Sequence, residues 1–132
     1  MTHLPDVETF CELASEATLV PVFRRLVADT LTPVSAYCRI VGDDSAFLFE
    51  SVVGGERIGR YSFVGADPFL VLSAQGTQLT VSGEGRDTRT REVEDPLAEL
   101  EERLQQLSAV QLPDLPRFCG GAVGYAGYDF WP

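Results

Sequence analysis

The fold is decided by residues 69–82, which read FLVLSAQGTQLTVS. Two runs rich in apolar and β-branched residues, 69–74 and 78–82, flank the turn Gln75-Gly76-Thr77. Runs of this length on either side of a short glycine-containing turn predict a β-hairpin. The two strands should therefore be antiparallel.

Further strands are expected on the N-terminal side of this hairpin. Residues 46–51 read AFLFES and are mostly apolar, residues 60–65 read RYSFVG, and a glycine-rich connection joins them. Both runs have the length and composition of strands. Residues 83–87 are predicted to form a solvated loop.

Three helices are expected around these strands. The first begins at Pro5-Asp6, the second runs from Thr32-Pro33 to about Arg39, and the third begins at Asp95-Pro96. In the second and third helices, Thr or Asp is followed by proline, which is a good helix start because the side chain caps the helix and proline suits its first turn. In the first helix, the start signal Pro5-Asp6 is followed by apolar residues at helical spacing. The third helix has one apolar stripe, expected to face the core, made of Leu97, Leu100, Leu104 and Leu107.

Two more segments are expected to be extended. Residues 19–23 are rich in β-formers, but Pro21 cannot donate to a ladder, so an edge strand is predicted. Residues 118–125 resemble a strand, but several of their positions are glycine, which has no side chain to pack. Together the pattern predicts an α+β fold, a mostly antiparallel β-sheet packed with a few helices, in one domain over residues 1–132. That domain is expected to be incomplete, because the terminal Phe130-Trp131-Pro132 caps no element.

Charge and composition argue against several classes of function. The net charge is −10, and the positive side chains are all arginine. Such a negative field repels phosphate backbones, so nucleic-acid binding is not expected. No apolar run approaches the ~18–20 residues that span a bilayer, and the N-terminus lacks the features of a signal peptide, which predicts a cytoplasmic protein without membrane attachment.

Metal and nucleophile chemistry is also not expected. The three cysteines, Cys11, Cys38 and Cys119, are far apart among apolar neighbours, so buried reduced thiols are predicted rather than zinc ligands or disulfides. The single histidine is His3, near the N-terminus, which leaves no partner for a catalytic triad. Neither catalytic nor metal-binding residues are predicted in this chain.

The candidate ligand site lies at the end of the 46–51 strand. The Glu50 carboxylate suits an ammonium group, the Ser51 hydroxyl suits a carboxylate, and the Arg60 guanidinium could form a fork with the same carboxylate. This combination is typical of amino-acid recognition. The alternative, a strand end with Glu50 solvated or paired to Arg57 or Arg60, is left open by the residues themselves.

Three stretches of the sequence resemble the N-terminal part of the large subunit of anthranilate synthase, component I. They are TPVSAY at 32–37, FLFES at 47–51 continued by GGERIGRYSFVG at 54–65, and FCGGAVGY at 118–125 followed by Tyr128-Asp129. Their order and spacing also agree with the family. In the LLES motif of the family, the second leucine is replaced here by Phe49.

The resemblance implies an enzyme, a lyase that converts chorismate to anthranilate in tryptophan biosynthesis. It implies Mg²⁺, ammonia supplied by a glutamine amidotransferase subunit (component II), and feedback inhibition by L-tryptophan. The chorismate and Mg²⁺ residues of the family lie in a C-terminal catalytic domain, so this chain alone is expected to be inactive. The tryptophan site of the family maps onto Glu50 and Ser51, which we extend to Arg60.

Other identities are compatible with the same residues. The closest is the large subunit of aminodeoxychorismate synthase, whose N-terminal region is similar. A stand-alone amino-acid-binding module and a functionless remnant of the gene are two further alternatives.

Overall fold

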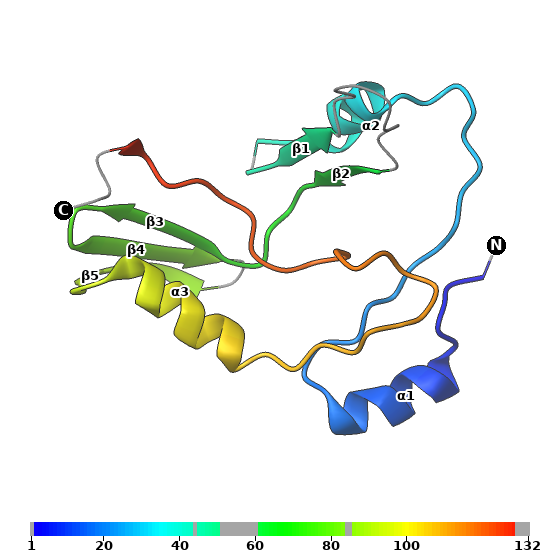
Figure 1. Ribbon diagram of the computed structural model, residues 1–132, viewed down its shortest axis with the longest axis horizontal. Coiled ribbons are helices and arrows are strands. Elements are labelled where there is room, and N and C mark those ends of the chain that lie inside the picture. The colour runs from blue at the N-terminus through cyan, green and yellow to red at the C-terminus, as the bar shows by residue number, and fades with distance from the viewer. Residues whose placement is uncertain (1, 44, 51–60, 84–85, 129–132) are drawn as a thin grey trace, which may run out of the picture. The chain divides into compact units, whose positions relative to one another are not determined.

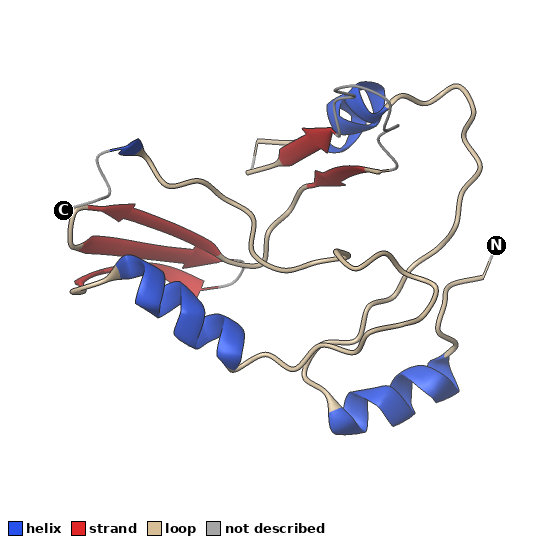
Figure 2. Ribbon diagram, in the orientation of Figure 1, coloured by secondary structure: helices blue, strands red, loops and turns tan. Residues whose placement is uncertain are grey.

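The computed structural model of the chain describes residues 2–43, 45–50, 61–83 and 86–128 (Figure 1). These residues form three helices and two antiparallel sheets, which confirms the α+β class (Figure 2). The elements are, in chain order, α1 Val7–Glu16, α2 Pro33–Ile40, β1 Phe47–Glu50, β2 Ser62–Gly65, β3 Val71–Gln75, β4 Gln78–Gly83, β5 Arg86–Glu92 and α3 Pro96–Gln105.

The chain divides into two compact units. Unit 1 consists of Met1–Val27 together with Glu94–Pro132, and unit 2 consists of Ala28–Val93. Unit 2 thus contains all five strands and α2, whereas unit 1 contains α1 and α3.

The predicted hairpin forms two of the three strands of the larger sheet in unit 2, with β4 in the middle. β3 pairs with β4 from Val71↔Ser82 to Gln75↔Gln78. Gly76 in the turn has a φ of +57°, a left-handed conformation that glycine adopts without strain. Leu79 of β4 is 1% exposed, so it is the most buried hydrophobic side chain among the described residues.

The third strand of this sheet was not predicted. Residues 83–87 were expected to be a solvated loop, but β4 extends to Gly83, and Arg86 and Asp87 begin β5. The prediction failed because β5 reads RDTRTRE, which has no apolar residue to mark a strand. Its pairing with β4 includes a hydrogen bond between the Thr80 and Thr90 hydroxyls, 3.0 Å long.

The smaller sheet is the pair β1–β2, and both strands were predicted in place. Their register runs from Phe47↔Gly65 to Glu50↔Ser62. Helix α2 contacts both strands. It begins as predicted at Thr32, whose hydroxyl accepts a hydrogen bond from Ser35 N (3.1 Å) while Ser35 Oγ accepts one from Thr32 N (2.9 Å). This reciprocal pair is a capping box, which fixes the start of α2. The two paired strands are called the β1–β2 ribbon below.

Unit 1 joins the two ends of the described chain through short backbone contacts. Thr18 N and Leu19 N both donate to Ser108 O (3.0 Å each), and Ser108 N donates to the Thr18 hydroxyl (2.8 Å). Arg25 forms an exposed ion pair with Asp114, with a nitrogen-to-oxygen distance of 3.5 Å. Residues 19–23 take part only in the isolated β-bridges Leu19↔Ala109 and Leu4↔Phe23. They form no strand, so the predicted edge strand is wrong.

Three further expectations are corrected. Residues 118–125 form no strand; three glycines make an extended backbone costly to order, and Gly121 has a φ of +137°. The cysteines were expected to be buried, but all three are exposed, including Cys38 of unit 2. The stripe on α3 was expected to face the core, yet Leu97 is 48% and Leu104 42% exposed.

Candidate functional site

The polar end of the β1–β2 ribbon places Glu50 directly opposite Ser62. Directly opposite residues in an antiparallel pair project from the same face of the sheet, and the faces alternate along each strand. The pair Leu48↔Val64 therefore lies on the same face as Glu50 and Ser62. Glu50 and Ser62 are exposed, whereas Leu48 and Val64 are half-buried, so this face has a polar end beside an aliphatic patch.

The other face of the ribbon is aromatic. The rings of Phe47 and Phe49 lie 5.3 Å apart between centroids, and those of Tyr61 and Phe63 lie 6.2 Å apart. Phe49 and Phe63 are directly opposite one another. Phe49, the residue that departs from the family motif, thus lies on the face opposite to Glu50.

The structure places one of the three predicted ligand residues. Glu50 is the last residue of β1, as expected. Ser51 and Arg60 lie outside the described residues, so their grouping with Glu50 stays a prediction. Ser62, Leu48 and Val64 were not selected from the sequence. The signal that could have found them is the alternation within 46–51 and 60–65, once the pairing of the two runs is known.

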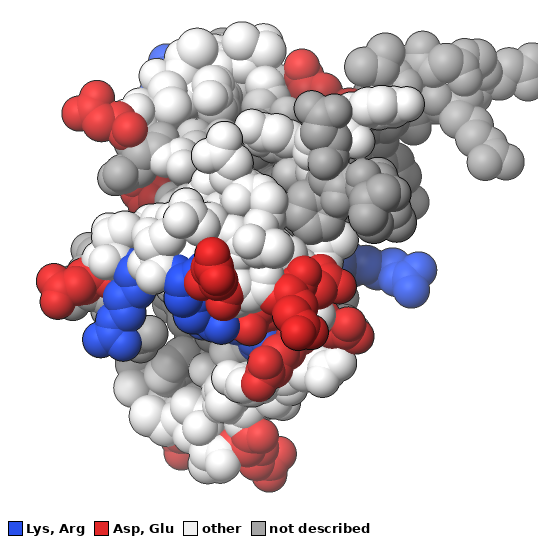
Figure 3. Space-filling view, turned by 90° about the vertical axis from the view of Figure 1, so that its left-hand side faces the viewer, with Lys and Arg blue, Asp and Glu red and all other residues white. Residues whose placement is uncertain are grey.

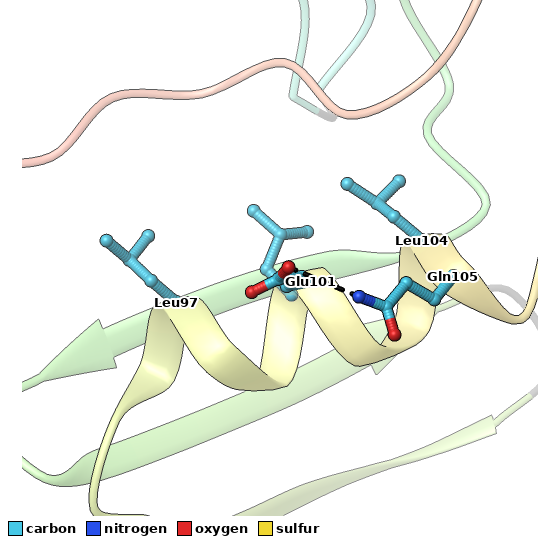
Figure 4. Close-up of a pocket in the computed structure, with 5 residues that line it drawn as sticks. Leu97, Glu101, Leu104 and Gln105 are labelled. Carbon is cyan, nitrogen blue, oxygen red and sulfur yellow. Dashed lines mark hydrogen bonds between the residues drawn. The ribbon is translucent and has the colours of Figure 1, made fainter.

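A shallow hollow is found elsewhere, on α3. It is lined by Leu97, Leu100, Glu101, Leu104 and Gln105. Figure 4 shows the Leu97 and Leu104 side chains pointing to the same side of the helix, with Gln105 Nε2 donating to Glu101 Oε1 (3.2 Å). All of the lining residues belong to one helix, and none belongs to the predicted ligand site.

The charged groups of the described residues were compared with the requirements of a metal site. No cluster of three or more His, Cys, Asp or Glu that could hold a metal ion occurs among them. The face drawn in Figure 3 carries both arginine and acidic side chains. The pKa of Asp6 is lowered because its carboxylate accepts hydrogen bonds from Thr9, but Asp6 serves as the N-cap of α1.

The helices were also compared with the length and hydropathy of a membrane span. Within the described ranges, none has the length and apolar character needed to cross a bilayer.

Known proteins with similar sequences include several subunits of anthranilate synthase. Anthranilate synthase component 1 of Synechocystis sp. is 42% identical over 126 residues, which is 95% of this chain. The Pseudomonas putida protein of the same name is 37% identical over 92% of the chain. Anthranilate synthase alpha subunit 2, chloroplastic, of Arabidopsis thaliana is 41% identical over 91% of the chain. The chain is homologous to part of anthranilate synthase component 1.

The match covers nearly all of this chain but only a small part of each relative. The chain spans about a quarter of the length of these anthranilate synthase relatives: 25% for the Synechocystis and Pseudomonas putida proteins and 21% for the Arabidopsis protein. No family model matches the sequence. No solved structure matches it either. The resemblance stated from the three sequence stretches is therefore confirmed by relatives that match nearly the whole chain.

Proposed function

We propose that this chain is the N-terminal regulatory part of an anthranilate synthase component 1 and contributes one side of a feedback site for L-tryptophan. Its relatives at about 40% identity support a role in tryptophan biosynthesis. The name that these relatives share also favours this activity over aminodeoxychorismate synthase. Chorismate conversion, Mg²⁺ and ammonia supplied by a glutamine amidotransferase subunit belong, in this proposal, to the complete enzyme.

The observation that carries the regulatory proposal is the position of Glu50. Its carboxylate is exposed at the end of β1, on the same ribbon face as the half-buried Leu48 and Val64. An amino acid with a large apolar side chain needs this combination of an anionic group for the ammonium and apolar surface for the side chain. Ser51 and Arg60 would bind the tryptophan carboxylate, as the sequence predicts.

Inhibition would arise because tryptophan binds one arrangement of the complete enzyme better than the other. A ligand shifts such an equilibrium only by its difference in affinity for the two states. The resemblance to the family also implies site residues beyond this chain, and tryptophan bound to both parts would link this part to the catalytic domain. The corresponding coupling free energy is about 1–3 kcal/mol.

The test is tryptophan inhibition of the full-length protein that contains these residues, with anthranilate formation as the readout. Glu50→Gln should raise the tryptophan concentration for half-inhibition by about ten- to a hundredfold, because a hydrogen bond to a charged group contributes about 1.5–3 kcal/mol. Ser51→Ala should act in the same direction. The values of kcat and KM for chorismate should not change.

Glu92→Gln is the matched control, because Glu92 is an exposed glutamate at the end of strand β5. It should leave inhibition as in the wild type. Unchanged inhibition in both Glu50→Gln and Ser51→Ala would contradict the proposed site. Formation of aminodeoxychorismate instead of anthranilate would contradict the proposed activity.

A further inference from the structure

We propose that Ser62 is a second ligand of the amino-acid ammonium group, acting together with Glu50; this inference rests on the tryptophan site of the proposed function. Ser62 is the residue directly across the β1–β2 ribbon from Glu50. The sequence alone did not suggest this role, because Ser62 lies 12 positions after Glu50 along the chain.

The first support is geometric. Directly opposite residues of an antiparallel pair have Cβ atoms about 4.5–5.5 Å apart and side chains on one face. Glu50 and Ser62 form the last pair of the β1–β2 register, and both side chains are exposed. A small cationic group above this end can therefore reach both side chains at once.

The second support is the chemistry of an ammonium group. It carries three N–H donors and no acceptor, so it is best satisfied by several oxygen atoms around it. N–H···O bonds are about 2.7–3.2 Å long, so two oxygen atoms bonded to one nitrogen can lie about as far apart as the Cβ atoms of a directly opposite pair. The Glu50 carboxylate would supply the negative charge, and the Ser62 hydroxyl oxygen would accept a second N–H.

Two bonds to the ammonium would also fix the direction of the ligand. The Leu48↔Val64 pair lies two residues from the Glu50↔Ser62 pair on each strand. At the usual rise of a strand, the two pairs are about 6.6–6.8 Å apart. An indole side chain can cover that distance and lie against the half-buried aliphatic patch. Ser62 would therefore contribute to selecting tryptophan over smaller amino acids.

The decisive comparison is between Ser62→Thr and Ser62→Val in the full-length enzyme. These two replacements have nearly the same shape and both suit a strand, so they differ mainly in the hydroxyl group. The valine variant should need about tenfold more tryptophan for half-inhibition than the threonine variant, because only threonine retains the acceptor. Ser62→Ala should resemble the valine variant.

A ligand without the ammonium group identifies which part of tryptophan Ser62 contacts. Indole-3-propionate keeps the ring and the carboxylate but lacks the ammonium. Its binding, measured by calorimetry or by competition with tryptophan, should be equal in the threonine and valine variants. Ser73→Ala is the matched control, because Ser73 is an exposed serine in strand β3, and it should not change tryptophan inhibition.

The outcomes separate this inference from the proposed function. If Glu50→Gln weakens inhibition while the threonine and valine variants of Ser62 behave alike, Ser62 is not a ligand and the tryptophan site stands. If the valine variant weakens tryptophan and indole-3-propionate equally, Ser62 does not bind the ammonium. If neither position affects inhibition, the tryptophan site itself is wrong.

Discussion

The ring of Phe47 lies over the backbone of Gly65, its directly opposite partner in the β1–β2 ribbon. A methyl group on Gly65 would lie 2.7 Å from Phe47 Cζ and would overlap the adjacent Cε1 atom. Glycine at this position therefore lets the aromatic ring cover the ribbon. The ribbon in turn sets the register that brings Glu50 opposite Ser62.

Gly65→Ala is expected to destabilise unit 2. The added methyl group forces the Phe47 ring to move, and overpacking of this kind costs about 1–3 kcal/mol in the free energy of unfolding. Urea unfolding followed by circular dichroism measures the change. Gly42→Ala is the control, because a methyl group there would meet no atom within 4 Å. Equal stability of the two variants would show that the Phe47 ring does not lie over Gly65.

Thr32→Ala should weaken the start of α2. The alanine side chain cannot accept the hydrogen bond from Ser35 N, and loss of an N-cap costs about 1 kcal/mol of stability. Thr32→Ser keeps the hydroxyl and should remain close to the wild type. The free energy of unfolding of the three proteins, determined under the same conditions, provides the check. A loss of stability in the serine variant as large as in the alanine variant would argue against the capping box.

The start of α1 should loosen in acid because of Asp6. Hydrogen bonds from Thr9 hold the pKa of this carboxyl group below its ordinary value of 3.8. A group with a lowered pKa in the folded state stabilises the fold above its ordinary pKa, and this contribution is lost as the pH falls through the lowered value. The amide resonance of Thr9, followed by NMR from neutral to acidic pH, should report the loss.

Asp6→Asn isolates this effect from the other acidic groups of the helix. Asparagine caps a helix nearly as well as aspartate but has no charge to lose. The acid-induced change at Thr9 should therefore be smaller in this variant. An identical pH profile in both proteins would mean that Asp6 does not control the stability of the helix start.

Phe49→Leu, which restores the residue of the family motif, is expected to leave tryptophan inhibition unchanged. Phe49 lies on the aromatic face of the ribbon, whereas Glu50 lies on the other face. Leu48→Ala should raise the inhibitory tryptophan concentration, because it removes apolar surface on the same face as Glu50. Inhibition assays on the full-length protein compare the two. The reverse result would place the ligand on the aromatic face.

The 132-residue chain alone is expected to bind tryptophan weakly or not at all and to form no anthranilate. In the proposed function the chain supplies one side of the site, and one side alone cannot remove the indole ring from water, so most of the favourable apolar contribution would be lost. Isothermal calorimetry with tryptophan and a fluorescence assay for anthranilate test both statements. Micromolar binding would show that the chain carries a complete site.

Elements with a strong local signal were predictable from the sequence. The three helix starts follow from Asp6, Thr32 and Asp95, each of which caps its helix in the structure. Both sheets were recognised by their apolar runs, as far as those runs lie within the described residues. Strand β5 was missed because its residues are polar, and it is defined by pairing with β4 rather than by its own composition.

The candidate site was only partly predictable for the same reason. Glu50 could be selected as a polar residue at the end of an apolar run. The position of Ser62 opposite Glu50 follows from the register of two strands, and register depends on how separate segments of the sequence pair. The exposure of the α3 leucines was also not predictable, because a helical pattern shows which side chains share a face but not what covers that face.

The contact between Thr18 and Ser108 has a consequence for synthesis on the ribosome. These residues lie 90 positions apart, so at about 5–20 residues per second the first waits roughly 5–18 s for the second to be translated. Every strand of unit 2, by contrast, pairs with the strand just before or just after it in the sequence. The nascent chain can therefore complete its sheets while Thr18 and Leu19 still lack their partner Ser108.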